Sequence, residues 1–437
     1  AVYAVGGWAD GYSNAVPRML EGLTCPRKGL VGPWAHKYPH FALPGPRMGF
    51  LQETLRWWDY WLKDIDTGIM DEPQYRVWMQ DSAPPATHYL VRNGRWVAEP
   101  SWPSAHIQWQ KTYLSQKRLT DQPGNNEEIQ IHTPQTMGAR QGEWCGYGPD
   151  PDLPADQRED DGCSVVFETD PLAEPVEILG APVLTLQLAS DQPNAFIVAR
   201  LNDVAPDGAS TRVTFGALNL THRESHEFPE PLVPGETYTI RLQMNDAAQV
   251  FPAGHRIRIA VSNTLWPLFW PSPDLVTLTL NTRRSHLELP IRPRRESDQE
   301  LRPFERAESS QPQSAEALEP PAYKRVVERD DRLGESRLTV IDDTGMTRLT
   351  ELGWEHGSVS RQNYSIRDGD PNSGKIDLHW TMRFRRPDAD LDIRTETRSR
   401  LTSTRTEFLF TAEMDVYEHE KKTYSKTWSR SFARHLN

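Results

Sequence analysis

The sequence is poor in cysteine, with only Cys25, Cys145 and Cys163 among its 437 residues. An odd set of three without Cys-x-x-Cys spacing argues against a disulfide framework and gives no zinc-binding pattern. We therefore expect three free thiols, which favours a reducing, cytoplasmic location.

Long apolar runs and an excess of basic residues are also missing. No run approaches the roughly 20 apolar residues that cross a bilayer, so we expect no membrane-spanning segment and no membrane partner. The formal net charge of −12 argues against nucleic acid as a partner, because binding to phosphates requires a basic surface.

Proline and tryptophan, in contrast, are plentiful. The 36 prolines and 15 tryptophans favour loops and strand edges over a helical bundle. Because 437 residues exceed what one hydrophobic core holds, we expect two or three domains. The sequence has no initiator methionine and opens inside an apolar run at 1–5, so we expect it to continue a longer protein.

The first forty residues contain two similar motifs. An apolar run at 1–5 leads into Gly-Gly-Trp-Ala-Asp-Gly, which places Asp10 after a strand, and residues 28–31 lead into Gly-Pro-Trp-Ala-His, which places His36 after the next strand. A short helix fits between them, with Asn14 as its cap and Gly22 at its end. This alternation predicts a parallel sheet with its functional groups at the carboxyl ends of the strands.

A second helix is predicted over residues 50–64. One apolar stripe recurs at helical spacing, and Gly68 is the expected terminator. The stripe consists of Leu51, Leu55, Trp58, Leu62 and Ile65.

Beyond residue 72 the pattern changes to strands. Apolar and polar residues alternate at 184–188, 238–244 and 257–261, and turn sequences such as Pro-Asp-Gly at 206–208 separate such runs. This spacing is typical of a β-sandwich, and its length suits a jelly roll. Strand-like runs return after 322 and predict an antiparallel meander without an evident catalytic cluster.

The predicted fold class is therefore mixed, with four successive parts. Residues 1–103 form the last part of an α/β domain, and residues 104–294 form the jelly roll. Residues 295–321, rich in Pro, Glu, Ser, Arg and Gln, form a linker. Residues 322–437 form a further all-β domain.

Asp10 and His36 are the candidate catalytic residues. A serine hydrolase needs a base to take the hydroxyl proton and a carboxylate to hold that base in the correct tautomer. Asp before His is the order found in α/β-hydrolases downstream of the nucleophile. A helix cap and a hydrogen-bonded polar histidine are the structural alternatives for these two residues.

Several stretches together resemble the cocaine esterase and X-prolyl dipeptidyl-peptidase (CocE/NonD) family of serine hydrolases. The resemblance covers about residues 1–294 and implies that His36 is the general base, that Asp10 orients it, and that esters or amides are hydrolysed through an acyl-enzyme. The stretches are those at 6–11, 32–36, 50–64, 154–158, 169–172, 205–208 and 252–257.

The nucleophile of that family precedes its Asp, in a Gly-x-Ser-x-Gly elbow that this sequence lacks. Ser13, in Gly-Tyr-Ser-Asn-Ala at 11–15, is a poor substitute because it follows Asp10 by three residues and its motif ends in Ala. We therefore expect a serine upstream of Ala1 and no esterase activity from this chain alone.

The expected partner is a small ester or amide. The α-amino acid ester hydrolases of this family place acidic residues just after the triad Asp, where this chain has Tyr12 and Ser13. A carboxylic ester or acyl amide is thus favoured over an amino acid ester, X-prolyl peptides stay open, and no cofactor is expected. Trp144 and Tyr147 are candidates for the substrate pocket, with a sandwich edge as the alternative; the oligomeric state is left open.

No metal site is predicted. His36 and His40 have the spacing of two ligands on a helix, but the prolines around them argue against a helix. The stretch 368–379 begins like a calcium loop, yet it lacks Gly at the sixth position and Glu at the twelfth, so a hairpin turn is favoured.

Two other stretches have structural interpretations. The acidic run at 158–161 is expected to be a solvated loop, and the aromatic stretch 265–273 is expected to pack between the sandwich and the hydrolase part. The other possible function is a non-catalytic β-sandwich that binds a ligand or a protein.

Overall fold

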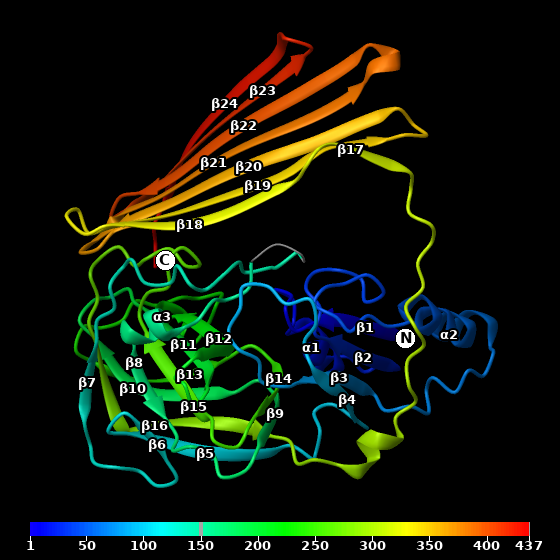
Figure 1. The fold of residues 1–437 in the computed structure, drawn as a ribbon. Helices are drawn as coiled ribbons and strands as arrows, with labels where there is room; N and C mark the ends of the chain where they lie inside the picture. Colours follow the sequence, from blue (N-terminus) through cyan, green and yellow to red (C-terminus); the bar gives the residue numbers. More distant parts are fainter. Residues whose placement is uncertain (148–151, 437) are drawn as a thin grey trace.

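The computed structural model describes residues 1–147 and 152–436, which form two β-sheets. The first sheet has 16 strands and is mixed, whereas the second has eight strands and is wholly antiparallel. In Figure 1 the second sheet forms an arch above the rest of the molecule. The structure confirms the predicted fold class to this extent: a mixed sheet with helices comes first, and an all-β sheet follows. No helix in the described ranges is long and apolar enough to cross a membrane.

The mixed sheet begins with three parallel neighbours, β1 (Val2–Gly7), β2 (Arg27–Gly32) and β3 (Tyr75–Gln80). β4 (Gly94–Glu99) pairs with β3 in the antiparallel direction. Gly7 pairs with Gly32, so the loops that follow β1 and β2 leave the sheet side by side. This register brings the two sequence motifs to the same edge of the sheet.

Two helices connect these strands, as predicted, but their details differ. In α1 (Ala15–Gly22), Asn14 occupies the N-cap position without a side-chain cap bond, because its amide instead bonds to Asn245 and to the backbone N–H of Asp246. α2 (Phe50–Lys63) ends at Asp64, which adopts the left-handed conformation with φ of 55°. Gly68 is therefore not the terminator.

The predicted apolar stripe of α2 faces solvent. Leu55 is 56% exposed and Leu62 is 71% exposed, and the other three members are also exposed. The opposite face carries the buried residues Glu53 and Trp57. Helical spacing thus predicted the helix correctly but not which face is buried.

The remaining strands of the first sheet enclose the largest hydrophobic core. Leu184, Leu186 and Leu188 point into it and are at most 1% exposed, as their alternation predicted. Three short helices lie in this region: α3 (Arg158–Gly162), η1 (Leu220–His222) and η2 (Glu296–Glu300). The strands are β5 (Gln108–Ser115), β6 (Arg118–Thr120), β7 (Glu128–Ile131), β8 (Val165–Glu168), β9 (Val176–Gly180), β10 (Val183–Ser190), β11 (Phe196–Val204), β12 (Ser210–Asn219), β13 (Thr237–Gln243), β14 (Ala247–Phe251), β15 (Arg256–Ser262) and β16 (Leu278–Ile291).

The acidic run at 158–161 is not a solvated loop. It forms α3, and Asp161 is buried between Arg200 at 3.1 Å and Arg258 at 3.0 Å. Asp161 also accepts hydrogen bonds from Asn202 and Ser210. The prediction was wrong because these partners come from distant strands of the sandwich.

The segment predicted as a linker packs against the first sheet over its first half. The centroid of the Phe304 ring lies 4.9 Å from that of the Trp96 ring, and the Arg76 guanidinium lies over the face of the Phe304 ring. Arg302 donates to Glu72 at 2.7 Å. The last part of the segment forms β17 (Ala315–Glu319), which pairs with β19, so the second sheet begins within the predicted linker and before residue 322.

Most of the second sheet is a meander, as predicted. Its strands from β19 to β24 pair in sequence order, and β18 pairs with β19. The turn at 368–369 joins two of these strands as a hairpin, with Gly369 at φ of 73°. The strands are β18 (Ala322–Asp330), β19 (Glu335–Leu349), β20 (Trp354–Arg367), β21 (Asp370–Arg386), β22 (Leu391–Ser403), β23 (Glu407–Glu418) and β24 (Lys421–Ala433), and η3 (Pro387–Ala389) follows β21.

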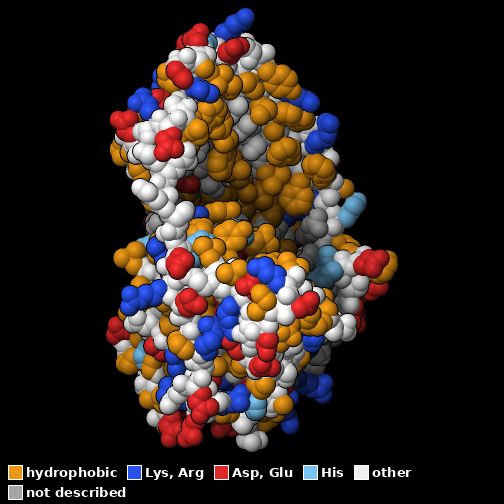
Figure 2. All heavy atoms as spheres, turned by 90° about the vertical axis from the view of Figure 1, so that its right-hand side faces the viewer, with side chains coloured by type: hydrophobic (Ala, Val, Ile, Leu, Met, Phe, Trp, Pro, Cys, Tyr) orange, Lys and Arg blue, Asp and Glu red, His pale blue; other side chains and the backbone are white. Residues whose placement is uncertain are grey.

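One face of this sheet is apolar and looks toward the body of the molecule. Trp380 and Met382 share a face of β21 and are each 41% exposed. Figure 2 shows hydrophobic side chains gathered over a hollow between the arch and the body. The aromatic stretch 265–273 lies at the attached end, where Trp270 donates to Ser403 and contacts Phe408. That stretch is therefore a packing seam, but with the second sheet and not with the α/β part.

Candidate active site

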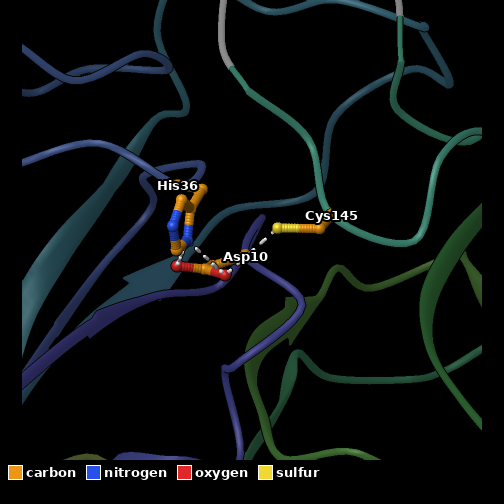
Figure 3. A group of neighbouring side chains, drawn as sticks. All are labelled: Asp10, His36 and Cys145. Carbon is orange, nitrogen blue, oxygen red and sulfur yellow. Dashed lines mark hydrogen bonds and ion pairs between the residues drawn. The ribbon is translucent and has the colours of Figure 1, made fainter. Parts of the chain in front are cut away.

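Asp10 and His36 meet at the carboxyl ends of β1 and β2. His36 Nδ1 lies 3.0 Å from Asp10 Oδ2 and 3.2 Å from Asp10 Oδ1. The side chain of Asp10 is only 12% exposed, whereas that of His36 is 40% exposed. In Figure 3 the two side chains face one another from adjacent loops. The imidazole is thus held by a sheltered carboxylate and still reaches solvent.

Glycine allows the two loops to approach this closely. A Cβ atom on Gly7 would lie 2.0 Å from the carbonyl oxygen of Trp34, and one on Gly32 would lie 2.4 Å from the Trp34 ring. Trp34 itself is buried, and its indole N–H donates to the Pro46 carbonyl at 2.8 Å. The glycines of both motifs therefore serve the packing that places Asp10 beside His36.

The loop after β1 folds back on its own carboxylate. The backbone N–H of Tyr12 donates to Asp10 Oδ1 at 3.0 Å, and that of Ser13 donates to the Asp10 carbonyl at 3.3 Å. Ser13 is buried just before α1, and no hydrogen bond in the described structure joins its hydroxyl to His36. The structure therefore shows no hydrogen-bonded nucleophile–base pair between Ser13 and His36 in the described residues.

Aromatic side chains border the imidazole. The Tyr147 ring centroid lies 5.2 Å from that of His36, and the Tyr12 ring centroid lies 5.6 Å from it. Trp144 contacts Tyr12, with ring centroids 5.6 Å apart. Both predicted pocket residues thus reach this region, and sequence reasoning missed the part that Tyr12 plays in it.

The segment that carries these aromatics comes from another part of the chain. The backbone N–H of His36 donates to the Gly146 carbonyl at 3.0 Å, and that of Tyr147 donates to Asp152 Oδ2 at 2.9 Å. On its outer side, Arg325 of the second sheet donates to Glu143 at 2.7 Å. The site is therefore built by the loop after β1, the loop after β2 and the distant segment 143–147.

Cys145 is a neighbour of Asp10 that the sequence did not indicate. Its thiol donates to Asp10 Oδ1 at an Sγ–O distance of 3.7 Å. Burial, and to a lesser extent the negative charge of Asp10, raises the pKa of this thiol. All three cysteines are free, as predicted. A lone cysteine more than 100 residues from either motif carries no sequence signal for this contact.

Two depressions flank the pair. One lies on the His36 side and is lined largely by aromatic and aliphatic groups, including Trp34, Phe41 and Tyr147. The other lies on the Asp10 side and is more polar, with Arg212 and Asp246 in its wall. Burial lowers the pKa of Arg212 to about 9 and raises the pKa of Asp246 to about 7. A substrate that approaches His36 therefore meets an apolar side and a polar side.

The structure does not bring the other histidine candidate into the site. His40 stacks on Phe50, with ring centroids 6.0 Å apart, and burial lowers its pKa. Across residues 1–147 and 152–436, Asp10, His36 and Cys145 form the one group of three side chains close enough together to share a metal ion. Their ligand atoms all lie within 4.8 Å of one another.

Comparison with known proteins agrees with this architecture. Residues 67–301, more than half of the chain, match the model of the X-Pro dipeptidyl-peptidase C-terminal non-catalytic domain. A Mycobacterium bovis protein, provisionally named a serine esterase, is 28% identical over 294 residues, which covers 60% of this chain and 45% of that protein. Cocaine esterase of Rhodococcus is 23% identical over 288 residues, with coverage of 60% and 48%. The chain thus spans about half the length of these curated relatives.

Two solved structures share the fold at low identity. An aminopeptidase from a Thaumarchaeota archaeon has a TM-score of 0.54 and 19% identity, covering 67% of this chain and 55% of its own. A CocE/NonD family hydrolase from Staphylococcus aureus has a TM-score of 0.50 and 13% identity, with coverage of 66% and 54%. On the match of residues 67–301, the chain belongs to the CocE/NonD and X-Pro dipeptidyl-peptidase family.

Proposed function

We propose that this chain supplies the acid–base half of a serine hydrolase, with His36 as general base and Asp10 as its orienting carboxylate. The observation that carries the proposal is the contact of His36 Nδ1 with both oxygens of Asp10, at 3.0 and 3.2 Å. With its Nδ1–H donated to the carboxylate, the ring presents Nε2 as the proton acceptor. This is the tautomer that a base needs to take a proton from a hydroxyl nucleophile.

The nucleophilic serine in this proposal lies outside residues 1–437. The position of Ser13 argues against a substitute within the loop, and the chain spans only about half the length of its curated relatives. In domain terms, we propose that residues 1–103 are the end of an α/β-hydrolase domain, 104–294 a jelly roll, 295–321 a linker whose last part forms β17 of the second sheet, and 322–437 an added all-β domain. His36 would pass the serine proton to the leaving group, and then activate water to release the acyl group.

The proposed substrate class is a carboxylic ester or an acyl amide. Tyr12 and Tyr147 border the imidazole with uncharged rings, and Tyr12 and Ser13 stand where a carboxylate would bind a substrate ammonium. The aromatic depression beside His36 suits an apolar acyl or alcohol group. X-prolyl peptides remain a further candidate class, because relatives in the family carry that name.

The test uses the longer protein that contains the serine, assayed with a p-nitrophenyl ester. His36→Ala should lower kcat at least about a hundredfold, since general bases contribute about that much. His106→Ala is the matched control, because its Nδ1 pairs with Glu99 at 3.0 Å but lies outside the site. A loss below about tenfold for His36→Ala would contradict the general-base role. Rapid turnover by the 437-residue chain itself would contradict the external serine.

A non-catalytic binding module is the second candidate. The specific observation in its favour is that the matched family model, residues 67–301, is described as non-catalytic and begins after His36. Reaction of the serine-bearing protein with a fluorophosphonate distinguishes the two, because only an activated serine is labelled. Absence of labelling in that protein would favour the binding module.

A further inference from the structure

The side chains of Asp10, His36 and Cys145 offer three different metal-binding atoms at one place. Their ligand atoms lie within 4.8 Å of one another, and Figure 3 shows the sulfur and the imidazole on two sides of the carboxylate. A carboxylate, an imidazole and a thiolate are all ligands that zinc accepts in proteins. This combination differs from the usual cluster of surface acids, because it includes both nitrogen and sulfur.

Two of the three separations suit a small tetrahedral ion. With zinc–ligand bonds of about 2.0 to 2.3 Å, neighbouring ligand atoms in a tetrahedron lie about 3.3 to 3.8 Å apart. The Cys145 Sγ to Asp10 Oδ1 distance is 3.7 Å, and the His36 Nδ1 to Asp10 Oδ1 distance is 3.2 Å. The ligand atoms of Cys145 and His36 lie within 4.8 Å of one another, so these two side chains must turn toward each other for an ion to take the place of the Nδ1 proton.

The backbone around the three residues fixes their positions. The N–H of His36 donates to the carbonyl of Gly146, directly after Cys145, at 3.0 Å. A Cβ atom on Gly11 would lie 3.2 Å from the Cys145 Cβ, so the segment that carries the thiol packs closely on the loop that carries Asp10. The ligands are therefore held together without a metal, which lowers the entropy cost of binding one.

The charge balance also favours a dication. Asp10 and the Cys145 thiolate bring two negative charges, and zinc neutralises both in a site where Asp10 is only 12% exposed. The side chain of His36 is 40% exposed, so solvent can reach the group and water can complete a fourth ligand position. A half-buried pair of anions is much less costly when a bound cation compensates it.

We propose that Asp10, His36 and Cys145 bind a zinc-like divalent cation, and that this cation switches off His36 as a base. On binding, the Cys145 thiol releases one proton to solvent, and the imidazole proton moves from Nδ1 to Nε2. The sulfur, Nδ1 and the Asp10 carboxylate then hold the cation, and Nε2 carries a proton and can accept no other. The binding half of the inference stands by itself, and the switching half rests on the proposed function.

The test measures metal binding by the full 437-residue chain and needs no measurement of enzyme activity. Cobalt(II), a spectroscopic substitute for zinc, should bind with a thiolate charge-transfer band in the near ultraviolet, and zinc should compete for the same site. Cys145→Ser should abolish the band, and His36→Gln should weaken binding at least about tenfold. Because the readout is binding, its failure is distinct from a failure of the hydrolase proposal.

Matched controls come from the same chain. Cys163→Ser should keep the band, because Cys163 is a half-buried thiol that packs against another cluster, formed by Met137, Val198 and Leu265. His226→Gln should also keep it, although His222 and His226 approach within 3.4 Å at Nδ1 and can attract metal by themselves. No thiolate band, a band that survives Cys145→Ser, a band lost in Cys163→Ser, or unchanged affinity in His36→Gln would each overturn the site. Far-ultraviolet circular dichroism checks that each variant is folded.

Discussion

Arg292 holds the first half of the predicted linker to the body, and replacing it should destabilise the protein. Its guanidinium is fully buried directly after β16 and donates to Glu99 at 2.7 Å. It also donates to both oxygens of Asp298, at 2.8 and 2.9 Å, in the short helix η2. One side chain thus joins the sandwich, β4 and the start of the segment that leads to the second sheet.

Arg292→Met removes all of these bonds while it keeps an apolar stem of similar length. Removing one partner from a buried ion pair costs about 3 to 5 kcal/mol. Glu99 keeps contacts with Ser104, His106 and Arg295, so the lower end of that range is expected. For a cooperative unit of about 300 residues, a loss of about 3 kcal/mol lowers the melting temperature by about 5 °C.

Differential scanning calorimetry measures this shift. Arg294→Met is the matched control, because Arg294 lies two residues further on, is 68% exposed and pairs with Glu177. Glu177 is buried but keeps its ion pair with Arg95 at 2.5 Å when Arg294 is replaced, and Arg294 itself is exposed. The control should therefore cost about 1 kcal/mol or less and move the melting temperature by less than about 2 °C. Equal shifts in the two variants would refute the reasoning, because burial of the Arg292 network would then add nothing.

Two further predictions concern the neighbourhood of the site. Burial raises the pKa of Asp246 to about 7, above its unfolded value, so the protein binds this proton more tightly when folded and loses stability as the pH rises from about 4 through 7. Asp246→Asn should match the wild type at pH 4 and exceed it by about 2 kcal/mol at pH 8 in urea unfolding, a figure reduced for partial exposure; equal stability at pH 8 would contradict the burial argument. Gly7→Ala should cost about 1 to 3 kcal/mol, because its Cβ would overlap the Trp34 carbonyl, whereas Gly22→Ala, with free space around it, should be nearly neutral in the same assay.

The helices and the second sheet show where sequence patterns succeed and where they fail. The 50–64 stripe predicted α2 within one residue, because periodicity reports helical geometry. It failed to predict burial, because the face that packs is set by Trp57 and by the ion pairs of Glu53 with Arg56 and Arg302. Alternation likewise predicted the antiparallel meander, yet nothing local indicated that its apolar face would border a hollow.

In the candidate site, too, local patterns predicted some features and missed others. The two Gly-rich motifs were enough to place Asp10 and His36 at the ends of neighbouring parallel strands, and the structure puts their side chains in contact. Their catalytic role stays a prediction. Cys145 and Tyr147 come from a segment whose path depends on contacts with Asp152 and with the second sheet.

The sequence by itself determined the features that depend on neighbouring residues: the positions of strands and helices and the order of Asp10 before His36. Only the tertiary structure decided which distant groups share a space. The burial of Asp161 between Arg200 and Arg258, the docking of Trp270 against Ser403 and the meeting of Cys145 with Asp10 are such cases. The physical reason is that a side chain's partners across the fold follow from how all the strands pack, which local spacing does not encode.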